Sequence, residues 1–171
     1  MRSRAGIAGI RNVGLVLLLA ASMACRRVGG GLDAGSLPNS ELTPGDVLDV
    51  GTEALCTTGY SKTVRHVQAD VKRHVYAEYG RTPEAGICCE VDHLIPLELG
   101  GSNRIENLWP QPYNLKWNAR TKDSLENYLH ERVCAGELSL QEAQAAIAKN
   151  WIDAYNQYYA GVAKKRPARD P

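Results

Sequence analysis

The chain lacks a strong net charge and lacks a long apolar run. Its 171 residues carry 20 basic and 19 acidic side chains, a formal net charge of +1. Such a balance excludes attraction of nucleic acid by the overall field, so any binding of that kind needs a local cationic patch. The apolar run over residues 13–21 is well short of the about 20 residues of a membrane-spanning helix. Internal repeats and low-complexity blocks are also absent from the sequence.

Residues 1–24 have the pattern of a secretory signal peptide. Three arginines precede the apolar run, and the small residues Ser22 and Ala24 end it in a cleavage pattern. Removal of this segment takes away three of the 20 basic residues and none of the 19 acidic ones, which leaves 17 against 19 and a net charge of −2. The sequence therefore predicts an exported protein, periplasmic or extracellular.

The chain has five cysteines, of which Cys25 stands at the predicted cleavage point. Residues 19–25 resemble a bacterial lipoprotein signal, although Ser22 stands where a Leu is usual, so a lipid anchor on Cys25 and plain secretion are both open. The other four favour two disulfides in an oxidising compartment. A bridge between the adjacent Cys88 and Cys89 would be strained, which favours a bridge from Cys56 to Cys134.

The remaining sequence predicts one folded domain between two polar ends. Residues 25–45 are rich in Gly, Ser, Pro, Asn and Asp and predict a flexible linker. Valines spaced by three and four predict a helix over residues 61–79. The domain is expected to span residues 46–160, and residues 161–171 to form a basic, solvated tail.

The later elements follow from apolar spacing and from turn residues. Residues 89–97 are short, rich in Val, Ile and Leu and closed by Gly100 and Gly101, which predicts a strand. A second short strand is expected over residues 107–109. Apolar residues at helical spacing from Asn118 onward predict a helix that ends near Gly136. A third helix is expected to begin with a capping box of Ser139 and Glu142.

The predicted first strand also carries the residues with the most chemistry. Asp92 and His93 lie among apolar residues, where burial of a carboxylate or an imidazole costs free energy unless each finds a partner. A divalent cation would be such a partner. Asn107 follows after a turn-rich connection, and Lys122 stands one helical turn after Asn118.

This order of strand, glycine-containing connection, strand and helix, with Asp-His on the strand and Asn on the helix, resembles the HNH endonuclease family. The resemblance covers about residues 89–135, and the strings at 107–112 and 117–126 resemble its secreted bacterial members. It implies an α+β fold with a ββα-metal core, flanking helices and disulfides in place of the paired Cys-x-x-Cys zinc knuckles of many members. The implied activity is metal-dependent hydrolysis of DNA, with RNA as a second candidate substrate.

The resemblance also implies roles for single residues. His93 is the expected general base, because the neutral imidazole accepts a proton near neutral pH. Asp92 and Asn118 are the expected oxygen ligands of Mg²⁺, with Mn²⁺ and Zn²⁺ as alternatives. Asn114 lies one turn before Asn118 and is the alternative ligand, and either Asn could instead cap the helix. Asn107 resembles the family's middle Asn, which pins the connection between the strands and so orients the base.

The remaining expectations concern the substrate and the competing functions. Arg120 and Lys122 are candidate phosphate contacts, with a solvated helix face as the alternative. His66, His74 and His130 lack a ligand-like spacing and are expected to be ordinary surface or interfacial residues. No module that reads bases accompanies the motif, so cleavage with little sequence specificity is expected. A non-catalytic nucleic-acid or cell-envelope binding module and a nuclease toxin with an immunity partner are the alternative functions.

Overall fold

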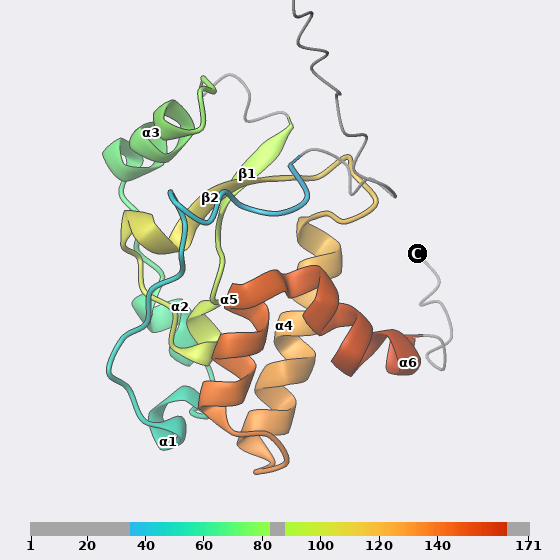
Figure 1. Cartoon of the computed structure of the whole chain (residues 1–171). Coiled ribbons are helices and arrows are strands. Elements are labelled where there is room, and N and C mark those ends of the chain that lie inside the picture. Colours follow the sequence, from blue (N-terminus) through green and yellow to red (C-terminus); the bar gives the residue numbers. More distant parts are fainter. Residues whose placement is uncertain (1–34, 83–87, 164–171) are drawn as a thin grey trace, which may run out of the picture. The chain divides into compact units, whose positions relative to one another are not determined.

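A two-stranded antiparallel sheet and surrounding helices make up the described residues, 35–82 and 88–163, of this computed structural model (Figure 1). The strands β1 (Cys89–His93) and β2 (Leu108–Pro112) pair so that Asp92 lies opposite Trp109 and His93 opposite Leu108. The predicted α+β class is confirmed. The predicted signal peptide, Cys25 and residues 164–171 lie outside the described residues.

Among the described residues, three helices precede the strands and three follow them. They are α1 (Thr52–Leu55), α2 (Tyr60–Val64), α3 (Ala69–Glu78), α4 (Ala119–Cys134), α5 (Leu140–Ala154) and α6 (Ala160–Ala163). The connection between the strands contains two 3-10 turns, η2 (Leu97–Leu99) and η3 (Ile105–Asn107), and a π-helical segment, η4 (Tyr155–Tyr159), joins α5 to α6.

The helix predicted over residues 61–79 is in fact two helices. Arg65 leaves the helical conformation with φ −69° and ψ 99°, and α3 begins only after Gln68. The carbonyl of Val64 accepts a hydrogen bond of 2.7 Å from the side chain of Asn103, far along the chain. This tertiary bond holds the end of α2, and the valine spacing that continues through the break carries no sign of it.

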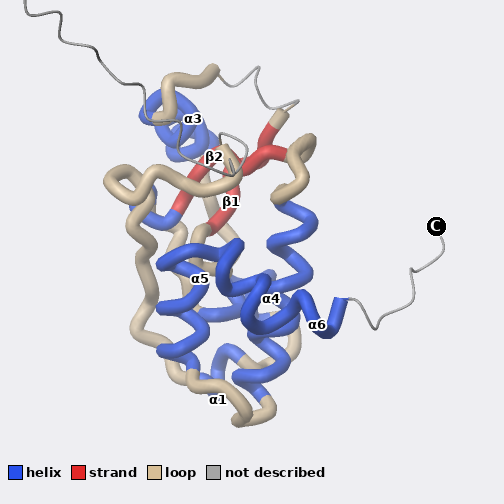
Figure 2. Tube along the Cα trace, turned by 45° about the vertical axis from the view of Figure 1, so that its right-hand side comes forward, coloured by secondary structure: helices blue, strands red, loops and turns tan. Residues whose placement is uncertain are grey.

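The core forms where α4 and α5 lie side by side, as Figures 1 and 2 both show. Leu125 and Leu129 of α4 and Ile147 and Trp151 of α5 are buried together with apolar residues of the strand connection. The predicted capping box at Ser139 is present and begins α5. The helix α4 therefore has one face in the core and another that is available to position side chains against β1.

Part of the predicted flexible linker belongs to the folded domain. Thr43 is buried and donates a 2.8 Å hydrogen bond to the carbonyl of Leu108. The indole of Trp151 donates a 2.8 Å bond to the carbonyl of Ser36. The folded part thus begins by Ser36 rather than at residue 46. The segment is attached mainly by hydrogen bonds and by few large apolar side chains. Its polar composition therefore gave no indication that it packs against the domain.

Two disulfides are present among the described residues. Cys56, directly after α1, is bonded to Cys134 at the end of α4, with Cα atoms 5.6 Å apart. This is the bridge that the sequence favoured, and it is confirmed. Cys88 and Cys89 are bonded to each other, so the bridge between neighbours that was expected to be unfavourable also forms. Disulfides are typical of proteins that fold in an oxidising compartment. None of the described helices is long and apolar enough to cross a membrane.

Candidate active site

The imidazole of His93 is held in one orientation at the end of β1. Its side chain is buried, with 3% of the residue exposed, and Nε2 lies 2.9 Å from Oδ1 of Asn103. Because the Asn103 amide nitrogen donates to the carbonyl of Val64, its oxygen must face the ring. An amide oxygen only accepts, so Nε2 carries the proton and Nδ1 is the unprotonated nitrogen of the neutral ring.

The environment of His93 favours this neutral form. Burial lowers the pKa of the ring below its ordinary value of 6.5, although the hydrogen bond that Nε2 donates to Asn103 and the charge of Asp92 act in the opposite direction. The ring is therefore neutral near pH 7, with Nδ1 ready to accept a proton.

Lys122 does not lie on the solvated face of α4, as a phosphate contact would require. Its side chain is 0% exposed, and its ammonium donates to Asp92 Oδ2 at 2.8 Å, to the His93 carbonyl at 2.6 Å and to Glu126. Burial lowers the pKa of Lys122, but the charges of Asp92 and Glu126 outweigh it and raise the pKa, so the side chain stays charged. Its observed role is to connect α4 to the end of β1.

Carboxylates outnumber cations around Asp92. Burial raises the pKa of Glu90, Asp123 and Glu126, and the negative charge of Asp92 raises each of them further. The single buried ammonium of Lys122 does not balance this group. A hard divalent cation prefers oxygen ligands of this kind, although among the described residues the ligand atoms close enough together to hold a metal ion are those of Cys56, His130 and Cys134.

Asn118 caps the helix that carries Lys122. Its Oδ1 accepts from the backbone N–H of Thr121 at 3.0 Å, and its Nδ2 donates to the carbonyl of Leu115 at 2.8 Å. The capping role left open by the sequence is therefore present. Within the described hydrogen-bond network no bond joins Asn118 to Asp92, and Asn114 is an exposed residue of the loop before α4. The same oxygen also accepts from the hydroxyl of Thr121 at 3.3 Å, so both of its lone pairs have a partner within the helix cap.

Asn107 pins the connection between the strands. It is 0% exposed, and its Oδ1 accepts from the N–H of Ile95 at 2.9 Å. Its Nδ2 donates to the carbonyls of Ile95 and Ser102, both at 2.9 Å. Gly101 lies so close that a Cβ there would overlap the Ile95 carbonyl oxygen. Asn107 does not contact the His93 ring. It is a positioning residue, because it holds the backbone of Ile95, two residues after His93.

Three residues near the expected site were not found from the sequence. Glu126 follows Lys122 by four residues, and this helical spacing could have indicated the pair. Asn103 and Arg65 carried no such signal, because tertiary packing alone brings them to His93. Arg120, the other predicted phosphate contact, is exposed in the first turn of α4.

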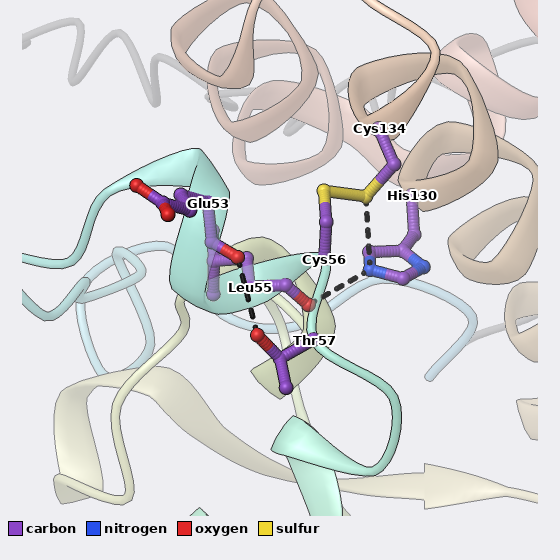
Figure 3. The surroundings of a disulfide bond; sticks show 6 residues. All are labelled: Glu53, Leu55, Cys56, Thr57, His130 and Cys134. Atoms are coloured by element: carbon purple, nitrogen blue, oxygen red, sulfur yellow. Dashed lines mark hydrogen bonds between the residues drawn. A yellow bond between two sulfur atoms is a disulfide. The ribbon is translucent and has the colours of Figure 1, made fainter.

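A separate group of ligand-type atoms surrounds the long-range disulfide (Figure 3). The Sγ atoms of Cys56 and Cys134 and a ring nitrogen of His130 all lie within 4.8 Å of one another, a group that could hold a metal ion. His130 Nε2 lies 3.4 Å from Cys134 Sγ and 3.1 Å from the Leu55 carbonyl oxygen. His130 therefore does have ligand-type neighbours, contrary to the expectation. Metals bind thiolates, so this group could act only after the disulfide is reduced.

A comparison of the chain with models of protein families, with curated proteins and with solved structures finds no match in any of the three. The assignment of function therefore rests on the residues around His93 and Asp92.

Proposed function

We propose that the chain is a metal-dependent endonuclease of the HNH type that hydrolyses phosphodiester bonds in DNA with little sequence specificity. The observation that carries the proposal is the orientation of His93. Asn103 fixes the proton on Nε2 and leaves Nδ1 as a base, and the preceding residue of β1, Asp92, accepts a hydrogen bond from Lys122 of α4. The two strands followed by α4 also match the order of elements in the ββα-metal fold.

In this proposal each residue has one task in the hydrolysis of a phosphodiester. Nδ1 of His93 takes a proton from the attacking water, and Asn103 holds the ring while the charge develops on it. Asn107 keeps the connection after β1 in place and so fixes the backbone next to the base. Arg120, exposed on the first turn of α4, offers a contact to the substrate phosphates.

The proposed cofactor is Mg²⁺, with Mn²⁺ and Zn²⁺ as alternatives. Asp92 would hold it from β1 and Asn118 from the start of α4, and Asn114 is the alternative partner. When bound, the ion supplies positive charge to the scissile phosphate and to the leaving oxygen. The excess of carboxylates around Asp92 supports a cation at this position.

We also propose that the protein is exported, because both disulfides fit an oxidising compartment. Residues 1–24 would be the signal peptide, and Cys25 would carry the lipid if the protein is anchored. Mass spectrometry of the mature N-terminus tests this: a diacylglyceryl adduct on Cys25 shows a lipoprotein, and an unmodified terminus shows plain secretion.

The enzymatic proposal is tested by incubation of the purified protein with plasmid DNA, single-stranded DNA and RNA, with Mg²⁺ or with a chelator. We expect cleavage that requires the metal. His93→Ala should lose at least about a hundredfold in rate, the usual scale for loss of a general base, while binding DNA as before. His74→Ala, which removes an exposed histidine of α3, is the matched control and should keep full activity. Undiminished cleavage by His93→Ala, or with chelator present, would refute the proposal.

Calorimetric titration with Mg²⁺ separates the ligands from the base. Asp92→Ala and Asn118→Ala should lose metal affinity, whereas His93→Ala should retain it. Asn114→Ala should resemble the unchanged protein. If only Asn114→Ala weakens metal binding, the second ligand is Asn114 and not Asn118.

A further inference from the structure

A cationic cavity opens beside His93 on the side of α2 and α3. It has a volume of about 230 Å³ and is lined by Arg65, His66, Val67, Lys72, Val91 and His93. Two of these side chains are permanently charged cations and two are imidazoles. Because no carboxylate is among them, the cavity is suited to an anion.

The two cations of the cavity have no acidic partner. Among the ion pairs of the described residues, none includes Arg65 or Lys72, and both side chains are exposed. Arg65 and His93 line the same cavity, so the guanidinium lies on the side of the ring that faces this space. A guanidinium with free donors next to the proposed base is placed to bind a phosphate oxygen.

Arg65 is held in place by the same residue that orients His93. Asn103 donates to the carbonyl of Val64 at 2.7 Å, directly before Arg65, and its oxygen lies 2.9 Å from His93 Nε2. The break between α2 and α3 therefore places the backbone next to Arg65 against the connection between the strands, where Asn103 binds it. Lys122 of α4 is buried and cannot reach a phosphate in solution. The exposed cations of the cavity can.

We infer that Arg65 and Lys72 form a subsite for a backbone phosphate of the nucleic acid, on the side of His93 opposite to α4. The inference rests on the proposed function, which it deepens, because the ligand is part of the same substrate. The neighbouring residues Asp92 and His93 leave β1 toward opposite faces. A strand of nucleic acid that contacts both would cross the end of β1, with the subsite holding a phosphate next to the scissile one.

The test compares two double variants that each remove one arginine and one lysine from the region of α2 and α3. The double variant Arg65→Ala with Lys72→Ala removes both permanently charged side chains from the lining of the cavity. Lys62→Ala with Arg73→Ala removes exposed charges of α2 and α3 that do not line the cavity, and is the control. Binding of a labelled DNA duplex is measured by fluorescence anisotropy, with chelator present, at several salt concentrations.

Each lost phosphate contact should make the slope of log Kobs against log salt shallower by about 0.9. Because the cavity variant loses one phosphate contact, we expect a change of roughly 0.9 for it and less than half of that for the control. Equal slopes for the two variants, or no DNA binding by the unchanged protein, would overturn the inference. Thermal unfolding is recorded for both variants, and since all four side chains are exposed, both should fold.

Two further arms separate this inference from the proposed function and from a simpler ligand. If the unchanged protein does not cleave DNA but the slopes differ as expected, the nuclease proposal fails and the subsite stands. If it cleaves, and both variants cleave and bind alike, the subsite fails alone. Inorganic phosphate is titrated at constant ionic strength, and thermal unfolding is recorded. Phosphate could stabilise the unchanged protein but not the cavity variant, while the two variants show the same DNA slope. That result would assign the cavity to free phosphate and overturn the assignment to nucleic acid.

Discussion

The substitution Asn107→Ala tests the structural part of the site most directly. It removes three hydrogen bonds of 2.9 Å to backbone groups of Ile95 and Ser102 and leaves those groups without a partner in a place that water does not reach. Each lost bond of this kind costs about 1 kcal/mol, and an unsatisfied buried group costs up to about 3 kcal/mol. We expect a loss of about 3–5 kcal/mol in the free energy of unfolding, a large share of the total of a typical domain.

Urea denaturation followed by tryptophan fluorescence measures this loss, because Trp109 and Trp151 are both buried. The control is Asn127→Ala, which removes one exposed bond to the Asp123 carbonyl and should change stability by no more than about 0.5 kcal/mol. The fraction of Asn107→Ala that remains folded should cleave DNA with a lower kcat and an almost unchanged KM. A loss of stability below about 1 kcal/mol would show that Asn107 does not pin the connection.

The charged residues, the long disulfide and the base give three further predictions. Lys122→Met should cost about 3–5 kcal/mol in urea denaturation, because it leaves the largely buried Asp92 without its cation; a neutral result would contradict the ion-pair network. Replacement of Cys56 and Cys134 by alanine opens a loop with a sequence separation of 78 and should cost about 4–5 kcal/mol by the chain-entropy relation. A cost below about 1 kcal/mol would contradict the bridge. Because burial lowers the pKa of His93 below 6.5, the base loses half of its unprotonated form only at a lower pH, so the midpoint of the decline of kcat at saturating Mg²⁺ should lie below pH 6.5. A midpoint above pH 6.5 would contradict the lowered pKa.

Local sequence patterns predicted the elements that carry the site. The spacing of apolar residues after Asn118, a capping residue, and the box of Ser139 and Glu142 located α4 and α5. The short apolar run before the paired glycines located β1, although the strand ends at His93 and not at residue 97. Such signals are readable because helix caps and strand alternation depend on residues only a few positions apart.

The side chains around the base were predicted less well. The sequence predicts Lys122 as a phosphate contact, with a solvated helix face as the alternative, since lysine is rarely buried; in the structure three acceptors together hold its ammonium in the interior. The composition of residues 25–45 predicts a linker, whereas the part from Ser36 onward is attached to the domain by bonds such as that from Trp151 to Ser36. In both cases the partners lie far apart in the chain.

The sequence by itself determined the α+β class, the positions of Asp92 and His93 on β1, and the favoured bridge from Cys56 to Cys134. Only the tertiary structure decided which nitrogen of His93 is free, because that depends on an amide ten residues away whose own orientation is set by the carbonyl of Val64. It also decided that Arg65 faces the base. Local periodicity reflects interactions within one element, whereas the proton of an imidazole and the neighbours of a cation depend on whichever elements pack together.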